Sequence, residues 1–213
     1  MLHRLRSICA DPHETGVKAD LHSDLADHRH RSPKLDWLLA QLESIRQRQE
    51  KVIVFTEFRD LQRVLHHRIR QHFGLSSAIV NGSTQAGHEA GEQSRQALID
   101  HFQRQPGFNV IILSTTAVGF GVNIQAANHV IHFTRPWNPA KEDQATDRAY
   151  RIGQTRAVQV YYPTVIAQDF VTFEDKLDTL LEAKRQLASD MLNGNPNIEL
   201  AEWSALETPT ASW

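Results

Sequence analysis

Short β-branched apolar runs alternate along the chain with amphipathic helical patterns, and this alternation restricts the fold of the 213 residues more than any other feature. Residues 52–55 have the sequence VIVF, apolar on both sides, which is typical of a strand buried inside a parallel sheet. Further strands are predicted at 77–80, 109–113, 129–133 and 158–162. The pattern therefore predicts an α/β domain with a mostly parallel sheet.

Apolar residues at helical spacing fill most of the intervals between these strands. Helices are predicted at 32–49, 58–73, 85–104, 140–153 and 169–192. We expect four parts along the chain: a partly flexible connecting segment at 1–31, an α/β lobe at 32–168, a long helix at 169–193 and an extension at 194–213.

Composition limits the class of protein. The net charge of −2 gives no global basic signature, so any nucleic-acid surface must be a local patch. The single cysteine, Cys9, excludes an internal disulfide framework and fits a reducing compartment. No apolar run is long enough to span a membrane, so we expect a cytoplasmic protein without a membrane partner. The 12 histidines show no four-ligand metal spacing and are interpreted as surface residues.

One glutamine and two arginines recur at helical spacing in residues 143–154, DQATDRAYRIGQ. At about 100° per residue, Gln144, Arg148 and Arg151 fall on one side of an α-helix. Guanidinium groups grip phosphate oxygens in two places and stay protonated, which suits the negative charge that develops in phosphoryl transfer. A solvated helix face with surface ion pairs is the alternative interpretation, and the stripe by itself leaves both open.

Small and hydroxylic residues follow two of the predicted strands. Gly82, Ser83 and Thr84 come after the second strand and precede a predicted helix, a place for a phosphate or for an ordinary capped turn. The sequence STTAVGFGVNI at 114–124 puts three hydroxyl groups at the end of the third strand. Its glycines allow close backbone approach to a ligand. Trp137 lies between a strand and a helix, where it either stacks on nucleic acid or covers the sheet edge.

The chain contains no Gly-x-x-x-x-Gly-Lys-Ser/Thr sequence and no convincing acidic magnesium site after a strand. It therefore has arginines suited to a nucleotide but no loop to cradle the phosphates. Such a domain would complete a site whose main part lies on another domain.

Taken in order, these segments resemble the second RecA-like lobe of the SNF2 family, ATP-dependent DNA translocases within helicase superfamily 2. The resemblance covers roughly residues 32–192: 51–59 (KVIVFTEFR) resembles motif IV, 114–123 motif V, and 137–154 motif VI and its approach. It implies a three-layer, RecA-like (P-loop NTPase-like) fold with a C-terminal brace helix.

The same resemblance implies the roles of individual residues. Arg148 and Arg151 would be arginine fingers that Gln144 helps to position. Residues that bind ATP or couple it to DNA would be Gly119, Gly121, Asn123, Asp147 and Gln154. Residues that contact DNA would be Gly82, Ser83, Thr84, Ser114, Thr115, Thr116, Trp137 and Asn138. ATP and Mg²⁺ would be held mainly by the first RecA-like lobe of the full-length protein, with double-stranded DNA as the other partner and no metal site on this chain.

Two departures from the family pattern indicate which members of the family the chain resembles. Val118 stands where glycine is common, and residues 134–136 (TRP) replace a more usual aspartate-bearing approach to Trp137. These features resemble bacterial members. Two alternatives stay open: a non-catalytic nucleic-acid or protein-binding module, and a lobe of a superfamily 2 RNA helicase. In every case the isolated chain is expected to be inactive without a lobe that carries the Walker motifs.

Overall fold

The computed structural model describes residues 2–10, 32–84, 94–117, 123–150 and 153–192. Within them, five strands form one sheet in the order β2-β3-β1-β4-β5, and every neighbouring pair is parallel. The strands are β1 (Lys51–Phe55), β2 (Ala78–Val80), β3 (Asn109–Leu113), β4 (His129–His132) and β5 (Gln159–Tyr161). The predicted fold class is confirmed.

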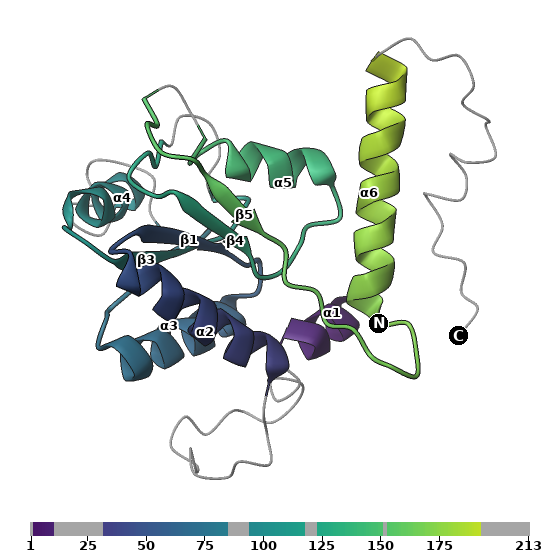
Figure 1. Cartoon of the computed structure of the whole chain (residues 1–213), viewed down its shortest axis with the longest axis horizontal. Coiled ribbons are helices and arrows are strands. Elements are labelled where there is room, and N and C mark those ends of the chain that lie inside the picture. Colours follow the sequence, from purple (N-terminus) through teal and green to yellow (C-terminus); the bar gives the residue numbers. More distant parts are fainter. Residues whose placement is uncertain (1, 11–31, 85–93, 118–122, 151–152, 193–213) are drawn as a thin grey trace.

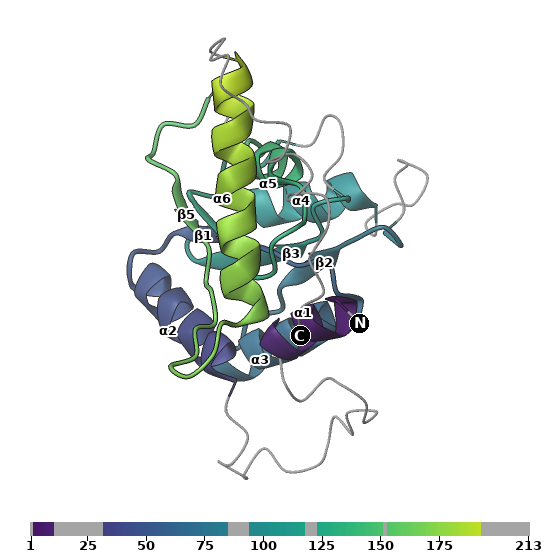
Figure 2. The same cartoon turned by 90° about the vertical axis from the view of Figure 1, so that its right-hand side faces the viewer.

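Helices cover both faces of the sheet. They are α1 (Leu2–Ala10), α2 (Pro33–Gln47), α3 (Arg59–Phe73), α4 (Arg95–Arg104), α5 (Pro139–Thr146) and α6 (Phe173–Leu192). Figure 1 shows α2 and α3 on one face and α4 and α5 on the other, so the domain has three layers. The turned view in Figure 2 shows α6 standing beside these layers, with α1 near its start.

The central strand β1 explains why the sheet needs both layers. Val52 and Val54 pack into the cluster under α2 and α3, while Ile53 and Phe55 pack into the cluster under α4 and α5. All four side chains are fully buried. Burial of such a side chain contributes about 1.5–3 kcal/mol, and alternate side chains of a strand point to opposite faces, so an unbroken apolar run needs cover on both sides.

Two helices begin later than their apolar periods predict. α4 begins at Arg95 rather than at 85, because the hydroxyl of Ser94 caps it by accepting from the amide of Ala97 at 3.1 Å. Residues 85–93 lie outside the described residues. α6 begins at Phe173 rather than at 169, because the hydroxyl of Thr172 accepts from the amide of Asp175 at 3.1 Å.

α6 is attached to the lobe by apolar and ionic contacts. Its residues Phe173, Leu177 and Leu181 form a cluster with Leu5 and Trp137. At the same end of α6, the buried ammonium group of Lys34, on α2, pairs with the carboxylate of Glu174. None of the helices within the described residues is both long and apolar enough to cross a lipid bilayer.

Two histidines of β4 correct the interpretation of the histidines as surface residues. His129 and His132 are fully buried. Nε2 of His129 lies 2.6 Å from a carboxylate oxygen of Glu50. The His132 ring stacks between Phe55 and Tyr162, with ring centroids 5.1 and 5.2 Å away. Sequence alone did not separate them from the others, because their burial depends on which faces of the sheet the helices cover.

His132 is expected to make stability depend on pH. Burial, and then the nearby Arg135 and Arg185, lower its pKa from 6.5 to about 3. Between these pH values the unfolded chain therefore binds more protons than the folded chain. The free energy of unfolding decreases as the pH is lowered. The loss expected from this group is about 1.4 kcal/mol per pH unit below 6.5. Urea unfolding of the chain at pH 7.5 and 5.5 checks it: His132→Gln should have the shallower pH slope, and equal slopes would contradict the assignment.

Candidate functional site

Hydroxyl side chains gather at the carboxyl ends of β1 and β3, around one carboxylate. The amide of Thr115 donates to Glu57 Oε1 at 2.7 Å, and the Thr115 hydroxyl donates to the same oxygen. The Thr116 hydroxyl lies 3.5 Å from Oε2 of Glu57. Ser114 and Thr116 hydroxyls lie 3.1 Å apart. The three predicted hydroxyl residues, which are consecutive in the chain, thus lie close to Glu57, because β1 and β3 are parallel neighbours and end at the same edge of the sheet.

The segment after β2 lies at the same edge of the sheet but is built differently from the prediction. Asn81 Oδ1 accepts from the amide of Ser83 at 2.9 Å, and the Thr84 amide donates to the Asn81 carbonyl at 3.0 Å. No helix begins within residues 81–84, and the next helix in the described part of the chain, α4, starts at Arg95. The turn therefore uses the amides that were predicted to be free. Gly82 and Ser83 remain exposed.

The predicted arginine stripe is not on one helix. α5 ends at Thr146. The next residues form turns in which the amides of Arg148 and Ala149 donate to carbonyls three residues back, at 3.2 and 2.9 Å. The carbonyl of Arg148 then accepts from the amide of Ile124 at 2.9 Å, and Ala149 packs in the core. These contacts turn the chain away from the helix axis, so Gln144 lies exposed on α5 and Arg148 lies buried after it.

Arg148 is a buried cation that has no counterion among the described residues. Its side chain is part of a residue only 9% exposed, and its Nε has no hydrogen-bond partner. It forms no ion pair within the described part of the chain. Buried charges are ordinarily paired, so an unpaired one costs free energy that a bound anion would offset. Its carbonyl accepts from the amide of Ile124, so it lies beside residues 123–128, which lead into β4.

Of the five residues predicted to bind ATP or couple it to DNA, three lie in the described part of the chain. The side-chain amide of Gln154 donates to the carbonyls of Gln125 and Ala127, both at 2.9 Å, and so fixes the turn beside Arg148. Asn123 Oδ1 is buried without a partner, while Asp147 is exposed. The other two, Gly119 and Gly121, lie outside the described residues, as does the predicted arginine finger Arg151.

The approach to α5 has a structural role. Asn138 Oδ1 caps α5 by accepting from the amide of Ala140 at 3.0 Å. The Trp137 ring meets Phe173 edge-on, with centroids 5.5 Å apart. Trp137 is partly buried and packs against α6, whereas the alternative interpretation placed it over the sheet edge; its contact with DNA stays a prediction.

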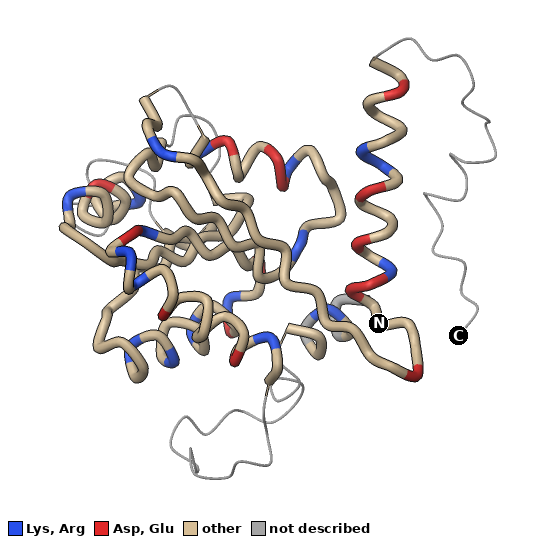
Figure 3. Tube along the Cα trace, viewed as in Figure 1, with Lys and Arg blue, Asp and Glu red and all other residues tan. Residues whose placement is uncertain are grey.

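A buried ionic network joins α5 to α6, and sequence reasoning missed it. The fully buried carboxylate of Glu142 accepts from Arg135 at 2.8 and 2.9 Å and from Arg185 at 2.6 Å. Arg135 also pairs with Asp178 of α6. The Tyr162 ring lies 4.5 and 5.8 Å from the two guanidinium carbons. Figure 3 shows acidic and basic residues interspersed along α6.

This network holds its arginines in the charged form. Burial lowers the pKa of Arg185, but the hydrogen bonds with Asp143 and Glu142 outweigh that effect and raise it overall. Burial likewise lowers the pKa of Arg135, and its bond to Glu142 raises it overall. Arg135 and Arg185 are thus committed to internal carboxylates, whereas Arg148 is not. A sequence signal was present only in Arg135, one of the departures from the family pattern.

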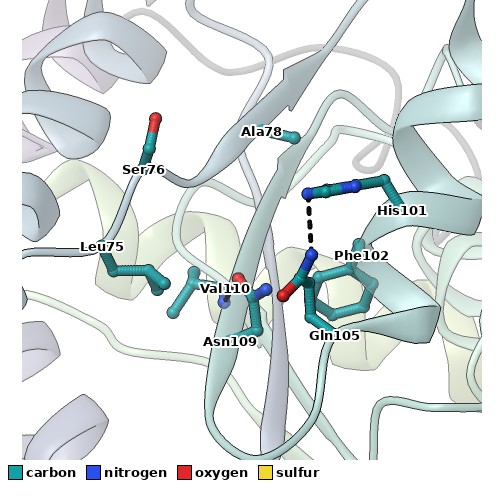
Figure 4. Close-up of a pocket in the computed structure, with 8 residues that line it drawn as sticks. All are labelled: Leu75, Ser76, Ala78, His101, Phe102, Gln105, Asn109 and Val110. Carbon is teal, nitrogen blue, oxygen red and sulfur yellow. Dashed lines mark hydrogen bonds between the residues drawn. The ribbon is translucent and has the colours of Figure 1, made fainter. Parts of the chain in front are cut away.

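A cavity of about 190 Å³ lies away from all of these groups, against α4, β2 and β3. Figure 4 shows its lining, in which the one drawn hydrogen bond joins Gln105 and His101 at 3.0 Å. None of the predicted site residues lines it, and neither does an acidic or basic side chain other than His101. We assign it no function.

Comparisons with known proteins agree with this geometry. Residues 33–153 match the family described as helicase conserved C-terminal domain. The chain is 56% identical to Zorya protein ZorD of Escherichia coli O139:H28 over 207 residues, 97% of this chain and 18% of ZorD. It is 38% identical to the putative ATP-dependent helicase/translocase YwqA of Bacillus subtilis over 192 residues, 90% of this chain and 19% of YwqA. The chain thus spans less than a fifth of either relative's length.

A solved structure extends the likeness to three dimensions. The SWI2/SNF2 ATPase core domain of Sulfolobus solfataricus superposes with a TM-score of 0.61 at 33% sequence identity. The match covers 84% of this chain and 33% of that one.

Proposed function

This chain belongs to the helicase conserved C-terminal domain family and is a C-terminal lobe of the SNF2 type, and from this premise we propose that it is the second motor lobe of an ATP-dependent double-stranded DNA translocase. Its task is to complete an ATP site held by the first RecA-like lobe of the full-length protein and to supply part of the DNA-binding surface. The location we propose is cytoplasmic, in a bacterium.

The observation that supports this proposal is the side chain of Arg148, which belongs to a residue only 9% exposed, has a buried Nε without a hydrogen-bond partner and pairs with no carboxylate among the described residues. An arginine finger has to reach a γ-phosphate on another lobe, so it must not be neutralised by a carboxylate of its own lobe. Arg135 and Arg185 fail that condition because they pair with Glu142. Arg148 meets it.

The proposed mechanism uses two separate surfaces of this lobe. Closure of the two lobes brings Arg148, together with Arg151 and with Gln144 in support, onto the γ-phosphate side of the nucleotide site. Bound ATP with Mg²⁺ supplies the phosphoryl group that is transferred to water. We propose that Mg²⁺ is held mainly by the first lobe.

DNA contact is proposed for the other surface, the edge formed by the ends of β2 and β3. Gly82, Ser83 and Thr84 lie there, as do Ser114 to Thr116. Asn123 and Gln154 lie by the segment that leads into β4, next to Arg148. We propose that this segment, with Gly119, Gly121 and Asp147, transmits the state of the nucleotide to the DNA surface. Trp137 and Asn138 are proposed as further DNA contacts.

An ATPase assay tests the function. The full-length protein is expected to hydrolyse ATP faster with duplex DNA than with single- or double-stranded RNA of equal length, measured as phosphate release. Stronger stimulation by RNA would favour the superfamily 2 RNA helicase, and no hydrolysis with either would favour the non-catalytic binding module.

The isolated 213-residue chain serves as the control in that assay. It is expected to release no phosphate above the buffer blank, with or without duplex DNA, because it has no loop to cradle the β- and γ-phosphates. Turnover by the isolated chain would overturn the two-lobe proposal.

A further inference from the structure

Glu57, at the carboxyl end of β1, occupies hydrogen-bond donors that an anion would otherwise use. One of its oxygens accepts both the amide, at 2.7 Å, and the hydroxyl of Thr115. The other lies 3.5 Å from the hydroxyl of Thr116. A backbone amide combined with neighbouring hydroxyls is the kind of donor set that binds a phosphate of a nucleic-acid backbone. A carboxylate and a phosphate are both pure acceptors, so they compete for it.

The contacts leave Thr115 with nothing to donate to DNA. A threonine has one amide N–H and one hydroxyl O–H, and in Thr115 both point to Glu57. A phosphate that approached this position would also meet the negative charge of the carboxylate. If the edge at β2 and β3 binds DNA, the Glu57 side chain has to leave these donors first.

A cation, Arg6, packs against the ring of Phe58, the residue that follows Glu57. The guanidinium of Arg6 lies over the Phe58 ring at 5.1 Å and over the Trp137 ring at 5.9 Å, and it donates to the carbonyl of Arg135 at 2.6 Å. Burial lowers the pKa of Arg6, and the charge of Glu57 acts in the opposite direction. Arg6 is therefore close enough to Glu57 for the two charges to attract each other.

We propose that Glu57 is an internal competitor for the DNA backbone: its carboxylate fills a phosphate-binding position formed by Thr115 and Thr116, and it swings toward Arg6 when duplex DNA binds. This inference rests on the proposed function. It makes the affinity for DNA weaker than the same edge would give without Glu57.

The test compares duplex DNA affinity of the full-length parent protein and Glu57→Gln, by anisotropy of a fluorescein-labelled duplex at one fixed salt concentration. Glutamine has the same size but carries no charge, its amide oxygen is a weaker acceptor than a carboxylate oxygen, and its NH₂ group donates instead of accepting, so the Thr115 amide and hydroxyl become easier for a phosphate to take. We expect about tenfold tighter binding, the scale of one like-charge contact near a protein surface. The matched control is Asp60→Asn, three residues further on, whose exposed carboxylate pairs with Arg63 and should change affinity less than about twofold.

A second substitution shows where the gain arises. Thr115→Val removes the hydroxyl but keeps the amide and the branched shape, so Glu57→Gln with Thr115→Val should lose most of the gain. If the parent binds duplex DNA and Glu57→Gln binds it equally well or more weakly, Glu57 does not compete with DNA and serves only to hold residues 114–116 in place. This inference alone is then overturned. If neither protein binds duplex DNA, the proposed function fails and the inference fails with it.

Discussion

Arg148→Ala in the full-length protein is expected to lower DNA-stimulated ATP hydrolysis by about 10³- to 10⁵-fold, the range for loss of an arginine finger. The physical reason is the loss of positive charge where the transferred phosphoryl group becomes more negative. Arg148 makes no ion pair within the described residues, so its removal breaks no internal salt bridge. The measurement is the steady-state rate of phosphate release at saturating ATP and duplex DNA.

Two further variants separate the finger from general effects of charge. Arg104→Ala removes an exposed arginine from the end of α4 and should leave the rate within about twofold of the parent. Arg148→Lys keeps the charge but loses the planar fork, so it should restore little of the rate. Hydrolysis by Arg148→Ala at near the parent rate would remove Arg148 from the mechanism.

Glu142→Ala is expected to destabilise the chain by about 3–5 kcal/mol, the cost of removing one partner from a buried ionic network. The fully buried carboxylate accepts three hydrogen bonds from Arg135 and Arg185, and its loss leaves both guanidinium groups near Tyr162 without their shared acceptor. The free energy of unfolding in urea at pH 7.5 measures this effect.

The matched control for that loss is another acid of the same network. Glu182→Ala removes a carboxylate that is 62% exposed and pairs with Arg185 at 2.6 Å. Exposed ion pairs contribute about 0–1 kcal/mol, so this variant should stay within that range of the parent. Equal losses for Glu142→Ala and Glu182→Ala would show that burial does not set the strength of the network.

Much of the fold could be predicted because local sequence controls it. The strand predicted at 109–113 has those bounds in the structure, and the strand predicted at 52–55 is one residue longer. Both runs are apolar on each side, and only a strand covered on both faces buries them completely. The predicted starts of α4 and α6 were wrong. The apolar period extends further toward the N-terminus than either helix does, because the capping hydroxyls of Ser94 and Thr172 fix the first turns of α4 and α6.

The candidate site was less predictable because distant contacts determine its geometry. Nothing in the sequence between Thr146 and Tyr150 stops a helix, yet α5 ends there because Arg148 bonds to Ile124 and Ala149 enters the core. The ionic network of Glu142 and the contact of Glu57 with Thr115 likewise join residues far apart in the chain. Sequence spacing led to a hypothesis about which residues carry the chemistry, and that hypothesis stays a prediction; spacing alone did not indicate which of these residues would be buried, exposed or already paired.

We propose that the nucleotide and the DNA contact separate surfaces of this lobe. The variant Arg148→Ala tests this separation when two quantities are measured on one preparation of the full-length protein. These are the single-turnover rate of hydrolysis of bound ATP and the dissociation constant for duplex DNA. We expect a rate lower by about 10³-fold or more, with DNA affinity within about threefold of the parent. An unchanged rate, or a parallel loss of rate and DNA affinity, would contradict it.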